Sequence, residues 1–460
     1  MREYAAYGET NLGDKTLSTR VEKTLDQLSS APEASISAAC KDPYQAKAVY
    51  RLLSNDKFTA EAVLCVSKNE TIERIRKSNV DTVLIPQDTT FLNYTGLKET
   101  KGLGLIGSDK NSRGLVMHSA LAIGEDGQIF GLLSEKIWSR PEDEAGKKKL
   151  RKKLPIEEKE SYKWIETLGT ADITDKIDGI KFIHICDREG DLYELFSRAH
   201  LKGATYLCRR VHERIVQNEG EEEQLVNAFI EKLPVGGYMK VNVHRDSHTN
   251  REGRVAELEI KYGKTRIKKP SSLRISDQAS EFVDVNIISA KEISVFGEVK
   301  DPVSWQLVTN DEVTSIDEAI KNVERYSHRW QIEIFHYTLK SGCTIEKLQE
   351  STADKLIKLI ALYTVIAIRI MILTHLARTT PETLCEPEFQ PDEWSVLYKV
   401  VNKTKEAPKK PPTMLEAVIM IAKLGGFLAR KSDGFPGVKV IWRGLTTLNT
   451  ILEASLYLLR

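Results

Sequence analysis

The chain has 460 residues, of which 41% are hydrophobic and 29% charged, and its formal net charge at pH 7 is +1. This size predicts a large core divided among two or three domains. The near-zero net charge excludes a protein that binds nucleic acid through overall basicity, so any attraction for DNA must come from local basic clusters. Such clusters occur at 147–153, 261–269 and 403–410, and the last of these reads better as a solvated loop.

The six cysteines have no paired metal-binding spacing, and they fit a reduced cytosolic protein better than a disulfide scaffold. The first residues lack the pattern of a signal peptide. The longest apolar stretch, 359–368, ends at Arg369 and is too short to span a bilayer. We therefore expect a soluble intracellular protein without a membrane partner, with a buried core helix at 359–368.

Residues 1–70 have the periodicity of helices, with predicted segments at 16–28 and 43–53 and a helix start at Thr59. In the second segment Lys47, Tyr50 and Arg51 fall on or near one face. A helix with basic and aromatic side chains on one face can enter a major groove. An ordinary amphipathic bundle helix would show the same pattern.

Two aspartates follow short apolar runs that predict buried strands. Asp88 follows 83–86, and Asp187 follows 182–186. An acid at the end of a buried strand lies on a rigid edge, where a metal ion can be held at little ordering cost. Each aspartate alone is also typical of a turn or a helix cap.

The interval from Asp187 to the next candidate acid, Glu333, is too long for a single crossover and is rich in strand signals. These signals predict an α/β sheet with a mostly antiparallel insertion before the helix of Glu333. The predicted strands are 204–211, 237–244, 254–262, 282–290 and 303–309.

Glu333 belongs to a pattern of four polar residues, Tyr326, Arg329, Glu333 and Lys340. On one α-helix they would fall within a sector of roughly 60°. A carboxylate flanked by two cations and a phenol suits an acid that binds a metal beside a phosphate backbone. The same stripe would also suit an exposed helix face with paired charges.

Residues from about 381 begin with several prolines and pass a Lys/Pro-rich linker at 403–412. Two helices are predicted after it, at 414–424 and 440–459. Their apolar faces are larger than so short a tail can bury alone, which predicts self-association.

Three motifs together resemble the insertion-sequence-four group of DDE transposases. They are Asp-Thr-Thr at 88–90, Cys-Asp-Arg-Glu at 186–189 and Tyr-x2-Arg-x3-Glu-x6-Lys at 326–340. Shorter matches in the same order extend the resemblance over essentially the whole chain, at 11–14, 48–51, 109–114, 138–141 and 421–427.

The resemblance implies an α/β fold with a ribonuclease-H-like catalytic core. It implies a helical DNA-binding domain at 1–70, a catalytic domain at 71–380 with a β-rich insertion at about 204–310, and a helical dimerisation domain at 381–460. Asp88, Asp187 and Glu333 would be the catalytic metal ligands, for Mg²⁺ or Mn²⁺. Three such carboxylates can hold two divalent ions about 3.5–4 Å apart, which suits in-line attack on phosphate.

The resemblance also implies DNA contacts. Tyr326, Arg329 and Lys340 would hold phosphates of the cleaved end. Arg51 and Arg209 match DNA-contacting arginines, although the next basic position of the family is Val211 in this chain. Trp305 matches a tryptophan that stacks on a flipped-out base, an interaction worth about 1–3 kcal/mol. Without the resemblance, a core aromatic of a β-strand is the preferred interpretation of Trp305.

The implied function is cut-and-paste DNA transposition. A homodimer would bind the transposon end repeats, cleave them through a hairpin and join them to target DNA, on the nucleoid in the bacterial cytosol. The alternative is a ribonuclease-H-class metal-dependent nuclease without strand transfer, which would not need to hold a hairpin. The three intact carboxylates argue against a domesticated DNA-binding protein without catalysis.

Overall fold

The computed structural model describes residues 4–9, 12–40, 42–107, 111–141, 154–171, 173, 177–243, 253–271, 280–293, 301–430 and 433–458. The predicted basic cluster at 147–153 and part of the match at 109–114 lie outside these residues. The chain divides into two compact units. The first unit comprises Met1–Asn79, Thr89–Ala145 and Ile332–Arg460, and the second comprises Val80–Asp88 and Gly146–Gln331.

The first unit begins with five helices: α1 (Ala5–Gly8), α2 (Lys15–Ser30), α3 (Ile36–Cys40), α4 (Pro43–Leu53) and α5 (Ala60–Arg76). Three of them, α2, α4 and α5, correspond to the predicted helices. Side-chain caps explain where they start. The Asp14 carboxylate accepts the N–H groups of Thr16 and Leu17, and the Thr59 hydroxyl accepts the N–H of Ala62. The predicted start at Thr59 and the bounds of α4 are confirmed.

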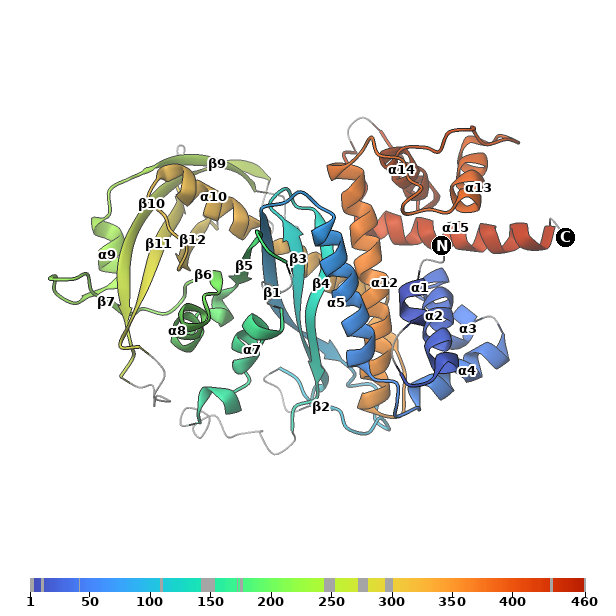
Figure 1. Ribbon diagram of the computed structural model, residues 1–460, viewed down its shortest axis with the longest axis horizontal. Helices are drawn as coiled ribbons and strands as arrows, with labels where there is room; N and C mark the ends of the chain where they lie inside the picture. Colours follow the sequence, from blue (N-terminus) through green and yellow to red (C-terminus); the bar gives the residue numbers. More distant parts are fainter. Residues whose placement is uncertain are drawn as a thin grey trace. The chain divides into compact units, whose positions relative to one another are not determined.

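The strands of the first unit are β2 (Gly104–Leu105), β3 (Arg113–Gly124) and β4 (Ile129–Trp138), together with the end of β1 (Thr82–Asn93). Strands β3 and β4 pair in antiparallel fashion. The Tyr94 N–H donates to the Arg113 carbonyl at 2.8 Å, which fastens the chain just after β1 to the start of β3. Helix α5 packs on β4 (Figure 1).

Helix α12 (Ala353–Thr379) confirms the predicted buried core helix and extends it at both ends. It is long and apolar enough to cross a membrane by length and composition, but 89% of its most apolar window is buried inside the protein. Helices α2, α5, α14 (Met414–Leu424) and α15 (Val438–Leu458) pack against it (Figure 1). Helix α13 (Pro391–Asn402) packs on α14 and α15.

The tail helices do not leave their apolar faces uncovered, as the sequence argument for self-association assumed. Met414, Ile421 and Trp442 are buried within the chain, where α12 and α2 supply the cover. The tail indeed does not bury these faces alone, but their cover comes from α12 and α2 of the same chain, so the faces themselves are not evidence for self-association.

The second unit is built on a mixed sheet. The first part of β1, β5 (Lys181–Cys186) and β6 (Thr205–Arg209) are parallel to one another. Strand β6 is antiparallel to β12 (Ser304–Thr309), and the antiparallel order continues through β11 (Phe282–Glu292) to β10 (Arg254–Lys268). Strands β7 (Ile215–Val216) and β9 (Gly237–Val243) pair with β10, and β8 (Gln224–Leu225) pairs with β7. The predicted antiparallel strands before Glu333 are confirmed for β9 to β12, whereas β6, predicted as the first of them, is parallel to β5 (Figure 1).

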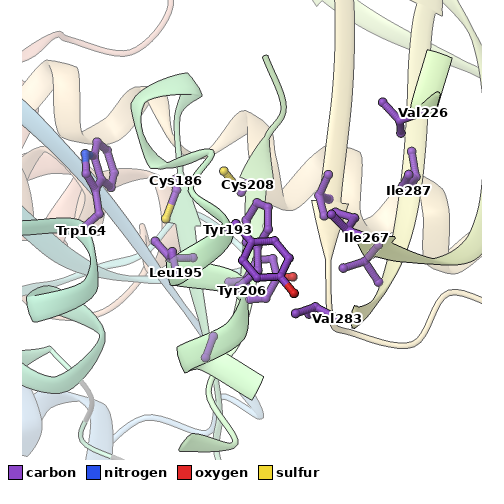
Figure 2. Close-up of a cluster of buried hydrophobic side chains, with 14 of the residues drawn as sticks. Trp164, Cys186, Tyr193, Leu195, Tyr206, Cys208, Val226, Ile267, Val283 and Ile287 are labelled. Atoms are coloured by element: carbon purple, nitrogen blue, oxygen red, sulfur yellow. The ribbon is translucent and has the colours of Figure 1, made fainter. Parts of the chain in front are cut away.

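Helices α7 (Tyr162–Thr170), α8 (Tyr193–Lys202) and α9 (Val226–Lys232) bury one cluster of side chains with these strands. Figure 2 shows its members reaching from Trp164 on α7 to Ile287 on β11. Cys186 and Cys208, paired in register at the ends of β5 and β6, belong to it. Because the ends of β5 and β6 are packed against this cluster, the backbone that follows each strand leaves it in a fixed direction.

The segment with the four-residue pattern is not one continuous α-helix, and that prediction was wrong. Helix α10 (Ile316–Ser327) ends in a turn at 328–329, and α11 (Trp330–Tyr337) passes into a π-helical segment, η5 (Thr338–Gly342). At the turn the Gln331 N–H donates to the carbonyl of His328, three residues earlier in the chain, instead of four as in an α-helix. In η5 the Cys343 N–H reaches back five residues to Thr338. The 60° sector therefore does not describe how these side chains project.

Candidate active site

Asp88 lies within β1, and Asp187 directly follows the end of β5, the parallel strand beside β1. The register of β1 and β5 runs from Thr82 opposite Lys181 to Pro86 opposite Ile185. One step on, the Gln87 amide contacts Cys186 Sγ at 3.4 Å. The next pair in this register is Asp88 and Asp187.

Neighbouring strands lie about 4.8 Å apart, and residues in register point to the same face of a sheet. Continued beyond the paired residues, this alignment sets Asp88 opposite Asp187, and both residues are partly exposed. Asp187 follows the end of its strand, as predicted. The predicted strand end at Asp88 was wrong, because β1 continues past Asp88 to Asn93 and pairs with β3.

The local structure around Asp187 leaves it able to bind a ligand. Its Oδ1 accepts the Glu189 N–H at 2.7 Å, which caps the short helix η4 (Arg188–Gly190). Its backbone carbonyl accepts the Cys208 thiol at 3.4 Å, which ties the turn to β6. Glu189 itself pairs with Lys163 at 3.4 Å. Asp187 is thus a cap residue, as the simpler interpretation held, but the cap occupies only one of its oxygens.

Two adjacent carboxylates are hard oxygen donors of the kind that Mg²⁺ and Mn²⁺ prefer, so the pair fits such an ion. Within the described ranges, no group of three or more His, Cys, Asp or Glu side chains could by itself hold a metal. Glu333 lies on α11 in the first unit and is partly buried. Its meeting with the two aspartates stays a prediction.

Arg329 lies beside this pair. Its Nη1 is 4.0 Å from Asp88 Oδ2, and about four-fifths of each side chain is buried. The turn that separates α10 from α11 places it there, because the Arg329 N–H donates to the Tyr326 carbonyl at 3.0 Å. A cation next to a metal-binding carboxylate can also hold a phosphate oxygen.

Tyr326 is 3% exposed, which differs from the open phosphate contact expected of it. Burial raises the pKa of its hydroxyl to about 12, although Arg329 and Arg209 oppose the shift. Trp305 lies against it, with ring centroids 5.4 Å apart and an edge-to-face geometry. In this structure Tyr326 supports its neighbours rather than presenting its hydroxyl to solvent.

Arg209 and Trp305 stand on the antiparallel strands β6 and β12 beside Tyr326. The Arg209 guanidinium donates to the Ser304 carbonyl at 3.0 Å, and its half-buried position lowers its pKa. Trp305 is itself only partly buried. Both side chains therefore keep a surface that could contact DNA, and their DNA contacts stay predictions.

Lys340 belongs to the first unit and lies in η5. Its Nζ donates to the Phe91 carbonyl at 2.7 Å. Burial lowers the pKa of Lys340, and Glu346 opposes the shift. The neighbouring His336 is buried, and burial together with Lys340 lowers its pKa to about 3. His336 is therefore neutral at physiological pH, and its low pKa makes it a weak proton acceptor.

Arg51 is exposed on α4, as are Tyr44, Lys47 and Tyr50. The opposite face of this helix is buried through Ala46, Val49, Leu52 and Leu53. The predicted basic and aromatic face is therefore turned to solvent.

Asp191 is a supporting residue that the sequence argument missed. It is 1% exposed, and its Oδ2 accepts the N–H groups of Val211 and His212 at 2.7 Å each. It also forms an ion pair with Arg214 at 2.6 Å. These contacts fix the turn that follows Arg209 on β6. The second aspartate of Asp-Arg-Glu-Gly-Asp was the available signal.

Comparisons with known proteins match the two terminal regions of the chain. Residues 5–58 match the family described as "Transposase DNA-binding", and residues 365–459 match "Transposase Tn5 dimerisation domain". Among solved structures, the chain is similar to a cryo-EM structure of the piggyBac transposase synaptic complex with hairpin DNA. The identity is 11% and the TM-score is 0.33, over 98% of this chain and 72% of that one.

Proposed function

Because the chain belongs to the Tn5-like transposases, we propose that it is a cut-and-paste DNA transposase that cleaves the transposon ends through a hairpin. That it is a DNA transposase with DNA-binding and dimerisation domains follows from the two family matches. The parallel alignment of β1 with β5, which when continued sets Asp88 opposite Asp187, carries the further proposal of a metal-dependent cleavage site.

Asp88, Asp187 and Glu333 would hold Mg²⁺ or Mn²⁺, with room in the donor set for two ions. When bound, such ions activate an attacking water or 3′-hydroxyl and stabilise the oxygen that leaves the phosphorus. The chain's own cations would hold the strand, with Arg329 on a phosphate next to the cleaved bond and Lys340 farther along it. This chemistry requires no histidine base.

We further propose that the catalytic core is ribonuclease-H-like. Parallel β1, β5 and β6 hold the acidic edge, and the antiparallel pair β3 and β4 continues from the end of β1, which supports this assignment. The antiparallel strands β10, β11 and β12 would be the insertion.

Arg209 and Trp305 favour a transposase over a plain nuclease. They line the same side of Tyr326, so an arginine for phosphate and an indole for a displaced base lie together near Asp187. A nuclease that only nicks has no need to hold an unstacked base.

The proposal is tested with DNA that ends in the chain's own flanking repeats. After incubation with Mg²⁺, a denaturing gel should show first a nick and then a hairpinned end, followed by joining to a target plasmid. Nicks that accumulate without hairpins or joined products would support the nuclease alternative. No cleavage of any end sequence would refute both.

A further inference from the structure

Two other segments of the first unit contact the indole of Trp442, which lies on α15. They are the loop between α2 and α3, and the end of α11 with η5. Trp442 is 2% exposed, so its ring is enclosed by these neighbours.

One polar and two packing contacts define this junction. The Trp442 Nε1–H donates to Glu33 Oε1 at 2.6 Å, a charge-assisted hydrogen bond. The ring of Tyr337 lies 6.1 Å from the indole, centroid to centroid, with the planes inclined by 48°. Gly342 lies so close that a Cβ there would be 2.9 Å from the indole Cε3.

Each contact belongs to a part of the chain with a different task. Glu33 lies within the residues that match the DNA-binding family, and Trp442 lies within those that match the dimerisation domain. Tyr337 and Gly342 end the segment that carries Glu333 and Lys340. One side chain therefore touches the end-binding region and the segment of the proposed third metal ligand.

Gly342 does not need to be glycine for its backbone, because its φ lies outside the left-handed region. The indole is what requires it. Segment η5 is π-helical, and its backbone bonds are longer-range and poorer than those of an α-helix, so its position depends on lateral packing. The Trp442 ring supplies that packing on the Gly342 side.

We propose that Trp442 is a positioning residue that fixes α11 and η5, so that cleavage depends on its contacts with Glu33 and Gly342 while end binding does not. This inference rests on the proposed function for its link to cleavage. The link between the indole and the order of η5 can be measured without any cleavage.

The experiment compares Gly342→Ala, Trp442→Phe and the double variant in the full-length chain, with Gly96→Ala as the control. Gly96 has nothing within 4 Å of an added Cβ, so alanine meets no obstacle there. The first measurement is hydrogen exchange of the amides of 333–343, and the second is Mn²⁺ affinity in paramagnetic resonance titrations. The third is nicking of end DNA at a Mg²⁺ concentration below saturation.

Gly342→Ala should speed exchange in 333–343, weaken Mn²⁺ binding and slow nicking at least tenfold, with end binding in gel shifts unchanged. The Trp442→Phe change removes the benzo atoms that the new methyl group would strike. The double variant should therefore recover most of what Gly342→Ala loses. Glu33→Gln, which keeps the volume and weakens the hydrogen bond, should shift exchange in the same direction by less.

If Gly342→Ala exchanges, binds Mn²⁺ and nicks like Gly96→Ala, the inference is wrong. It is also wrong if the double variant is no better than Gly342→Ala. If Gly342→Ala does not fold, the test uses Trp442→Phe and Glu33→Gln instead. Amide hydrogen exchange in 333–343 that equals the wild-type rate in both variants would then overturn the inference. If the wild-type protein never nicks end DNA, the proposed function is refuted. The hydrogen-exchange measurement would still show whether the Trp442 contacts hold η5 in place.

Discussion

Arg329 Nη1 lies 4.0 Å from Asp88 Oδ2, so a cation stands beside the carboxylate at the exposed part of β1. An arginine beside this carboxylate can have either of two roles, and the two roles predict different effects of replacing it. Arg329 could hold a DNA phosphate when Asp88 binds a metal, or it could serve only to neutralise Asp88 in the fold.

Arg329→Ala should lower the salt dependence of end-complex affinity by about 1 in log–log slope, because one phosphate contact is lost. Residual nicking should persist and rise at low ionic strength. Gel shifts and nicking over a range of KCl concentrations measure both. An unchanged slope with cleavage lost at every salt concentration would mean that Arg329 serves Asp88 alone.

Lys340 should lose its charge at a lower pH than an exposed lysine, because burial lowers its pKa below the ordinary value. As the pH rises toward 10, the wild-type salt slope should fall by about 1, whereas Lys340→Arg should keep its slope. The check is end affinity measured against salt at several alkaline pH values. Parallel curves for the two proteins would remove Lys340 from the phosphate contacts.

Trp305→Ala should slow hairpin formation far more than first-strand nicking. Nicking does not require a displaced base, whereas turning the strand back on itself does. Because Trp305 also packs on Tyr326, Trp305→Phe serves as the control that keeps an aromatic ring there. Equal slowing of both steps in the alanine variant would identify Trp305 as a core residue.

Leu428→Glu should prevent the pairing of two ends while leaving single-end binding intact. Leu428 is 65% exposed and lies within the matched dimerisation domain, so a charge there does not disturb the buried faces of α14 and α15. Native gels with one labelled end, at increasing protein concentration, separate single from paired complexes. Paired complexes at wild-type concentrations would exclude this surface from the dimer.

The sequence predicted the elements well where one local signal decides them. Thr59 caps α5, and the apolar runs before Asp88 and Asp187 are strands. It failed at residues 328–342, because helical spacing does not reveal a two-residue turn or a π-helical segment. It also assigned exposed roles to Tyr326, whose burial depends on Arg209 and Trp305, distant residues brought by β6 and β12.

The tail shows the same limit. The apolar faces of α14 and α15 were visible in the sequence, but their partner α12 was not assigned to them. The pairing of Asp88 with Asp187 was likewise only an expectation until the register of β1 and β5 was known. Long-range register depends on the whole sheet, so no local pattern could supply it.

The central claim is that Asp88 and Asp187 act together at one metal-dependent site. The most direct measurement is Mg²⁺-dependent nicking of end DNA by Asp88→Asn and Asp187→Asn, with Glu333→Gln alongside and the exposed Glu324→Gln as control. Each of the first three changes should abolish nicking and leave the gel shift of the ends within about twofold, because each removes a metal-binding charge at constant volume. Nicking at near wild-type rate by either aspartate variant would contradict the account.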